Sequence, residues 1–259
     1  KMKSINIGLL SAMPEEIGST LENLENVNLK EYGDLKIYHG EFKKKVQNYE
    51  SVYITLAWSG WGKVSAARAI TRILAGTNKI DFIIFTGVAG AANNNLNQWD
   101  ILIANEIIQH DMDARPIFEK FVLPPLKKAK LKSDLFLKNW ILSSLSKSVK
   151  KGNLTKFGHI KTGLIATGDS FISDESVIKR LKDELPNLEA IEMEGGAVAQ
   201  VAEQEGVPWA VLRVISDSAD SNSKIDFETF LKEYVLNSWE ILDCLIKNIP
   251  QIPIEKSHL

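Results

Sequence analysis

The end of one apolar segment carries residues that could do chemistry. Residues 209–215 form an apolar run that predicts a buried strand, and Ser216 and Asp217 follow it directly. Ligands of open α/β sheets bind at the carboxyl ends of the strands, so Asp217 lies where a catalytic group is expected. Arg213 is an unusual charge inside the same run. A carboxyl group in such a place can act as a general acid or base.

Two further carboxylates precede a helical pattern. Glu192 and Glu194 flank Met193, and the apolar side chains that follow recur at helical spacing until Gly206. Each residue also has an ordinary structural explanation when it is taken alone. Glu194 can complement the helix dipole, which contributes about 0.3–1 kcal/mol, Asp217 can cap the next segment, and the arginine can pair with an acid. Taken together, these residues are harder to explain by structure alone.

A third pair of acids follows the first predicted strand, at residues 4–10. The chain continues as Ser-Ala-Met-Pro-Glu-Glu, and Pro14 suits the first turn of a helix. Glu15 and Glu16 then lie near the positive end of the helix dipole. By themselves, these two acids are explained as surface residues that complement the dipole.

Glycines occur at three further strand-to-loop junctions. Residues 59–63 are Ser-Gly-Trp-Gly-Lys, residues 86–90 are Thr-Gly-Val-Ala-Gly, and residues 167–172 are Thr-Gly-Asp-Ser-Phe-Ile. Glycine allows the backbone to approach a ligand closely and leaves N–H groups exposed, although a tight turn explains it equally well. The first two segments match neither a dinucleotide-binding nor a Walker A pattern, so these ligand classes are not indicated.

The order of these motifs resembles the nucleoside phosphorylase/nucleosidase superfamily, and above all the 5'-methylthioadenosine/S-adenosylhomocysteine nucleosidases. Ala-Met-x-x-Glu, Ser-Gly-x-Gly-Lys, Gly-Asp-x-Phe-Ile, Glu-Met-Glu and Arg-Val-Ile-Ser-Asp-Ser-Ala-Asp carry the resemblance, which covers residues 5–245. The resemblance implies a central mixed sheet that is partly barrel-like, and a homodimer. The aromatic side chains of Trp61, Phe118 and Phe121, near the expected pocket rim, favour the same dimer.

The resemblance also implies an activity, hydrolysis of the N-glycosidic bond of 5'-methylthioadenosine and S-adenosylhomocysteine, with release of adenine. It assigns water activation to Glu16, protonation of the purine N7 to Asp217, and the ribose hydroxyls to Glu194. No metal or organic cofactor is required. The remaining implied site residues are Met193 against the sugar, Phe171 stacked on the purine, Ile172 at the purine edge, Trp61 and Phe227 in the pocket wall, Ser216 placing Asp217, and Arg213 orienting a carboxylate.

Two departures from the family pattern leave alternatives open. Val88 replaces a residue that is usually small and polar, and the loop at residues 112–132 is longer and more basic than is common. A phosphate-dependent nucleoside phosphorylase would need a cationic phosphate site, for which Lys63 and Arg115 are the candidates. An aminodeoxyfutalosine nucleosidase would use the same residues on a bulkier substrate. A catalytically silent nucleoside-binding protein is disfavoured because the three carboxylates are intact.

Length, composition and net charge disfavour several other classes of protein. The chain has 259 residues, 44% of them hydrophobic, with a net charge of −2, which gives no general attraction to nucleic acid or to membranes. Its one cysteine fits a reducing compartment, and we expect a cytoplasmic protein. Alternating strands and helices predict one three-layer α/β domain over residues 1–259, with an uninformative tail at 249–259.

Overall fold

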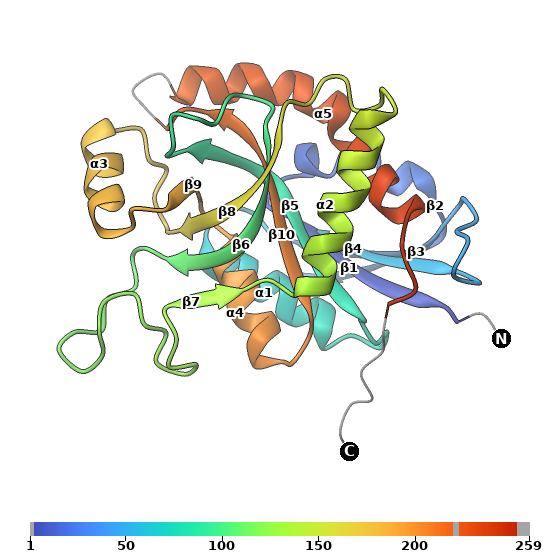
Figure 1. Cartoon of the computed structure of the whole chain (residues 1–259). Helices are drawn as coiled ribbons and strands as arrows, with labels where there is room; N and C mark the ends of the chain where they lie inside the picture. Colours follow the sequence, from blue (N-terminus) through green and yellow to red (C-terminus); the bar gives the residue numbers. More distant parts are fainter. Residues whose placement is uncertain (1–2, 220–222, 253–259) are drawn as a thin grey trace.

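The strands join one sheet that closes partly on itself (Figure 1). The computed structural model describes residues 3–219 and 223–252. The strands are β1 (Ile5–Ser11), β2 (Leu24–Tyr32), β3 (Leu35–Phe42), β4 (Val52–Trp58), β5 (Phe82–Ala91), β6 (Ile101–Gln109), β7 (Lys130–Lys132), β8 (Ile160–Thr167), β9 (Leu188–Glu192) and β10 (Trp209–Asp217). Within the described residues their order is β10-β6-β8-β9-β5-β1-β4-β3-β2, with β7 beside β6. A further pairing of β10 with β5 closes five strands into a barrel, which confirms the mixed, partly barrel-like sheet.

Helices cover both faces of the sheet. They are α1 (Lys63–Leu74), α2 (Leu135–Lys150), α3 (Glu175–Glu184), α4 (Gly195–Gln204) and α5 (Ser223–Lys247), with 3₁₀ turns η1 (Pro14–Glu16) and η2 (Leu21–Asn23). Successive side chains of a strand point to opposite faces. Phe82 and Ile84 therefore pack in one hydrophobic cluster with α2 and α5, while Ile83 and Phe85 pack in another with α1 and α4. The expected three layers are confirmed (Figure 1).

The central strands end at one edge of the sheet. β5 runs parallel to both β1 and β10, so the carboxyl ends of these three strands lie together. The sequence predicted that β5 ends at Phe85, but the strand continues to Ala91. The reason is tertiary: residues 87–90 pair with residues 213–217 of β10, and residues 90–91 pair with β9. The glycines in this stretch are therefore part of the sheet rather than a strand exit.

The strands β2, β7 and β9, the helix α3 and the turn η2 were not anticipated from the sequence. In β2 only Leu24 is buried, because this strand lies at the open edge of the sheet and pairs on one side with β3. In α3 only Leu181 is buried. Neither segment has the apolar face that makes an element visible in a sequence.

The basic loop at residues 112–132 is mostly irregular and ends in β7. Three of its lysines pair with glutamates from other segments: Lys120 with Glu184, Lys128 with Glu203, and Lys130 with Glu106. These pairs account for much of the basic charge that otherwise suggests a nucleic-acid surface. Across the described residues, no helix combines the length and the apolarity needed to cross a membrane.

The predicted tail begins inside the core. Ile249 is 1% exposed, and its carbonyl oxygen accepts a hydrogen bond from Asn48 Nδ2 at 2.9 Å. Residues 253–259 lie outside the described part of the chain.

Candidate active site

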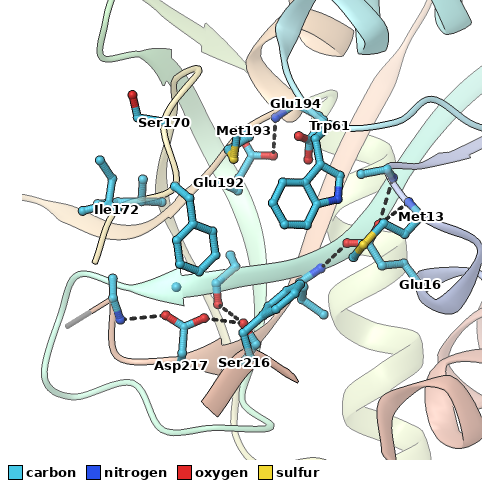
Figure 2. Close-up of a pocket in the computed structure, with 18 residues that line it drawn as sticks. Met13, Glu16, Trp61, Ser170, Ile172, Glu192, Met193, Glu194, Ser216 and Asp217 are labelled. Carbon is cyan, nitrogen blue, oxygen red and sulfur yellow. Dashed lines mark hydrogen bonds between the residues drawn. The ribbon is translucent and has the colours of Figure 1, made fainter. Parts of the chain in front are cut away.

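A pocket of about 560 Å³ opens at the carboxyl ends of β1, β5, β9 and β10 (Figure 2). Four carboxylates line it, and all four are at most 7% exposed: Glu16, Glu192, Glu194 and Asp217. Figure 2 shows Ser216 and Asp217 on one side of the pocket, and Met13 and Glu16 on another. The pocket therefore brings together acids from both ends of the chain.

Arg213 lies behind three of these acids and is completely buried. Its Nη2 donates a hydrogen bond to Glu192 and lies 3.6 Å from Glu194 Oε1, while its Nη1 lies 3.5 Å from Glu16 Oε1. The guanidinium also lies 4.5 Å from the ring centroid of Phe85. One cation thus faces three carboxylates, which explains the charge inside β10. A buried charge needs such partners, because it loses its hydration.

The hydrogen bonds indicate which of the three carboxylates holds a proton. Glu192 accepts hydrogen bonds from Arg213, from Thr167 Oγ1 and from the N–H groups of Glu194 and Gly195. Donors of this kind favour the charged carboxylate. Glu194 has only one backbone donor, the Gly62 N–H at 2.8 Å. Burial raises the pKa of Glu194 to about 8 against the lowering effect of Arg213. We therefore assign the proton to Glu194.

Glu16 is held by its own turn and by β5. Its Oε2 accepts hydrogen bonds from the N–H groups of Ala12 and Met13 at 2.8 and 2.9 Å, and its Oε1 accepts one from Val88 at 3.0 Å. Burial raises the pKa of Glu16, while Arg213 and these N–H groups lower it. A carboxylate with a raised pKa is suited to take a proton near neutral pH. The interpretation of Glu16 as an exposed, dipole-complementing acid is wrong, because it is 2% exposed.

Gly87 explains how Glu16 and Arg213 can approach β5 so closely. A Cβ atom at this position would lie 2.3 Å from Glu16 Oε1 and 2.4 Å from Arg213 Nη1. A glycine inside a strand often marks such a close approach. The absence of a side chain here is therefore a requirement of the carboxylate cluster.

An irregularity in β10 presents Ser216 and Asp217 to the pocket. The pairing with β5 shifts between Ile215 and Asp217, which leaves Ser216 as an extra residue in the strand. Such a bulge can re-aim side chains, and here two consecutive residues both line the pocket. Ser216 Oγ donates a hydrogen bond to Asp217 Oδ2 at 2.6 Å, and the Ala219 N–H donates one to Oδ1 at 2.8 Å.

Three aromatic side chains form the apolar part of the pocket. The rings of Trp61 and Phe171 stack with their centroids 6.3 Å apart, and Phe227 meets both rings edge-on. Ile172 and Met193 extend the same wall. Aromatic faces of this kind bind a nucleobase by stacking, which contributes about 1–3 kcal/mol per base. The site therefore combines an aromatic surface with buried acids.

Comparison with known proteins identifies the family. The sequence model of the phosphorylase superfamily matches residues 6–247. The 5'-methylthioadenosine/S-adenosylhomocysteine nucleosidase of Staphylococcus haemolyticus is 35% identical over 241 residues, which are 93% of this chain and 99% of the relative. The chain belongs to this nucleosidase family.

Two solved structures have the same fold as this chain. The Neisseria meningitidis 5'-methylthioadenosine/S-adenosylhomocysteine nucleosidase, in complex with methylthio-immucillin-A, has a TM-score of 0.82 and 29% identity, and the match covers 94% of this chain and 99% of that one. The Helicobacter pylori futalosine hydrolase has a TM-score of 0.81 and 28% identity, with 95% and 98% covered.

The structure brings together nearly all the predicted nucleosidase site residues. Both predicted catalytic acids and the predicted substrate-binding residues line the one pocket, with the exception of Arg213, which lies behind its wall. The sequence analysis named Glu192 but gave it no role, and it gave none to Thr167; Thr167 Oγ1 donates to Glu192, which in turn accepts a hydrogen bond from Arg213. Glu192 stood in the Glu-Met-Glu motif, but its buried position depends on the closure of the barrel. Nothing in the sequence indicated a role for Thr167, apart from its position before a glycine.

The structure shows where the two departures from the family pattern, Val88 and the loop at residues 112–132, lie relative to the pocket. Val88 lines the pocket and contributes its backbone N–H to Glu16, a role that does not depend on its side chain. Arg115 is exposed and bonded to Asp113 two residues away, outside the pocket lining. Phe118 and Phe121 are half-buried and are also outside that lining.

Proposed function

We propose that this nucleosidase-family protein hydrolyses the N-glycosidic bond of 5'-methylthioadenosine and S-adenosylhomocysteine and releases adenine. One observation carries the proposal: a single pocket is lined by Asp217 on one side and by Glu16 on another. Glu194 and the aromatic wall line the same pocket. Glycoside hydrolysis uses such a division between an acid for the leaving group and a base for the water.

Cleavage breaks the bond between ribose C1' and the purine N9, and the electron pair goes to the purine. In the proposal, Asp217 in its acid form donates a proton to N7, so the purine leaves as a neutral base. A well-placed general acid of this kind contributes about 10²–10⁴-fold to the rate. Ser216 orients the Asp217 carboxyl group, because its hydroxyl donates a hydrogen bond to Asp217 Oδ2 at 2.6 Å. Phe171 and Trp61 would hold the purine plane.

In the proposal, the two glutamates bind the ribose and activate the attacking water. Glu194 accepts hydrogen bonds from the ribose hydroxyls, and Met193 packs against the sugar. A water molecule attacks C1', and Glu16 takes the proton that the water loses. Three backbone N–H groups fix the Glu16 carboxylate, so its position is set before the substrate binds.

The charge of the pocket supports water as the nucleophile rather than phosphate. Four carboxylates line the pocket, and none of its described lining residues is Lys, Arg or His. Arg213 is behind the wall and engaged by three acids. Lys63 Nζ is bonded to Asp111 at 2.7 Å and to Gln109 at 3.2 Å. A phosphorylase needs a cationic site for its anion, and these cations are already paired.

The wider role follows from the same chemistry. Removing methylthioadenosine and S-adenosylhomocysteine serves methionine salvage and methyl-cycle recycling, and we propose that the protein does so in the cytoplasm. We also propose a homodimer, because Trp61 and Phe171, which line the pocket, remain 47% and 40% exposed. Aromatic side chains of this size favour a covering partner.

One assay tests the activity against its alternatives. Purified protein is incubated with methylthioadenosine in phosphate-free buffer, and adenine and methylthioribose are measured by chromatography. Glu16→Gln should nearly abolish adenine release. A requirement for phosphate, with methylthioribose 1-phosphate as product, would instead establish a phosphorylase. Preferential turnover of aminodeoxyfutalosine, the substrate class suggested by the futalosine hydrolase neighbour, would reassign the substrate.

A further inference from the structure

Two separate loops carry the exposed aromatic residues of the pocket. Trp61 lies in the turn that leads from β4 to α1, and Phe171 lies in the segment between β8 and α3. Their rings are nearly parallel, with an interplanar angle of 16°. Neither ring is buried enough for packing alone to fix it, since each is at least 40% exposed. Something else must therefore hold the two loops at a constant separation.

Three polar residues bond the loops to each other and to the end of β6. The Lys63 N–H donates to Asp169 Oδ1 at 2.7 Å, and the Asp169 N–H donates to Asp111 Oδ2 at 2.9 Å. Lys63 Nζ closes the ring by donating to Asp111 Oδ1 at 2.7 Å. We call Lys63, Asp111 and Asp169 the clamp. Each of the three residues is bonded to the other two, so no loop can shift without breaking a bond.

The clamp is continuous with the carboxylate that is proposed to bind ribose. Gly62 and Lys63 are adjacent, and their N–H groups point to two different acids: Gly62 to Glu194 at 2.8 Å, and Lys63 to Asp169. Gly62 has a φ of +94°, which side chains rarely adopt, and a Cβ there would lie 3.1 Å from Asp169 Oδ1. The same turn thus places Trp61, supports Glu194 and engages the clamp.

The clamp is partly shielded from water. The side chains of Lys63 and Asp111 are 19% and 32% exposed. Burial opposes the charge of Asp111, but the bonds from Lys63 and from the Asp169 N–H hold the pKa of Asp111 below its usual value. Behind the clamp, the ring of His110 occupies the space that a Cβ at position 168 would need, at 2.3 Å. The Phe171 segment is therefore held from both sides.

We propose that Lys63 and Asp111 are positioning residues that, with Asp169, set the separation of Trp61 and Phe171 and thereby determine substrate affinity. This inference rests on the proposed nucleosidase function. The clamp residues are outside the pocket lining, so they act through the aromatic rings and through the Gly62 N–H rather than on the reacting atoms. Their loss should weaken binding of the purine more than it slows bond cleavage.

Steady-state kinetics provide the first test. Lys63→Met and Asp111→Ala should each raise KM for methylthioadenosine about tenfold, the size expected for one partly exposed charged hydrogen bond, with kcat changed by less than about threefold. The double variant should be no worse than the more affected single variant, because the two residues share one bond. Arg68→Met is the matched control: it lies on the same helix and loses an exposed ion pair with Asp34, and its KM should match the wild type. An unchanged KM in both single variants, or additive effects in the double variant, would overturn the proposal.

Amide hydrogen exchange provides a test that does not need turnover. In Asp111→Ala, exchange should accelerate about tenfold in peptides covering both residues 59–63 and residues 168–172, while α2 stays as in the wild type. Acceleration in one loop only, or in neither, contradicts the clamp. If the wild type releases no adenine but both loops accelerate, the function fails and the clamp stands. If the wild type releases adenine but exchange in the two loops of Asp111→Ala does not accelerate, the proposed function stands and the clamp is refuted.

Discussion

Replacing Arg213 with methionine tests whether one cation holds the acid cluster together. Arg213 is completely buried and is bonded to Glu192, with Glu16 and Glu194 within 3.6 Å of its nitrogen atoms. Methionine keeps much of the side-chain volume but removes the charge. Glu192 then keeps its bonds from Thr167 Oγ1 and two N–H groups, but loses its only charged partner.

The loss of stability should depend on pH, and its sign follows from the pKa shifts. Arg213 lowers the pKa of Glu16 and of Glu194, which burial has raised above the ordinary value of 4.5. Without Arg213, both folded-state pKa values rise further. A group whose folded pKa is raised contributes stability below its unfolded pKa and loses it as pH rises through the folded pKa. The variant should therefore lose more stability than the wild type between pH 5 and pH 9.

The expected magnitude comes from the burial of the ion pairs. Removing one partner of a buried pair costs about 3–5 kcal/mol when the other stays charged. This full cost should appear at pH 9. At pH 5, where Glu16 and Glu194 can be protonated, the cost should fall to the lost bond with Glu192 and the lost cation–π contact with Phe85, which contributes about 1 kcal/mol.

Urea unfolding at pH 5, 7 and 9 measures the difference directly. Arg68→Met is the control, because its pair with Asp34 is exposed and its loss should leave the free energy of unfolding close to the wild-type value at every pH. An equal loss for Arg213→Met at all three pH values would refute the charge argument, since it would leave packing as the sole cause.

Three further outcomes are expected. Asp217→Asn should remain folded by circular dichroism but lose about 10²–10⁴-fold in kcat for adenine release; near wild-type turnover would exclude the acid role. Wild-type kcat/KM should rise as pH passes about 8, where Glu194 becomes a charged acceptor, and Glu194→Gln should lack this rise because the amide does not titrate. Gly87→Ala should cost about 1–3 kcal/mol in thermal or urea unfolding and most of the activity, because its methyl group would meet Glu16 and Arg213; a fully active variant would show that the cluster can relax.

The elements that carry a periodic apolar pattern were predictable from the sequence. Both β1 and β10 were anticipated, because each has several consecutive buried residues, and Asp217 was placed correctly at the end of β10. By contrast, β2 is almost wholly exposed, and α3 buries only one side chain. Such elements are stabilised by one neighbour or by the chain's own hydrogen bonds, which leave little trace in the order of side chains.

The site residues that act through other residues were less predictable. The roles of Glu16 and Glu194 came from the resemblance, because residue patterns alone favoured a dipole effect for Glu16 and explained Glu194, taken singly, equally well by such an effect. Glu192 and Thr167 face each other only because β9 and β8 pair in parallel, with Thr167 opposite Glu192. The closure of the barrel sets this strand register, so it cannot be predicted from the sequence of any single segment. The sequence therefore indicates which acids are present, but not which of them share one cation.

In the proposed mechanism, the cation that the three acids share links substrate binding to proton release. In the free protein, one guanidinium faces three carboxylates, and the fewest hydrogen bonds reach Glu194, which holds a proton with a pKa of about 8. The hydroxyls of a bound ribose would donate to Glu194 and favour its charged form. The displaced proton cannot pass to Glu16 if Glu16 is to accept one from water. Binding of the ribose diol and release of a proton to solvent are then one event, and Arg213 is the group that makes the third buried carboxylate charge tolerable.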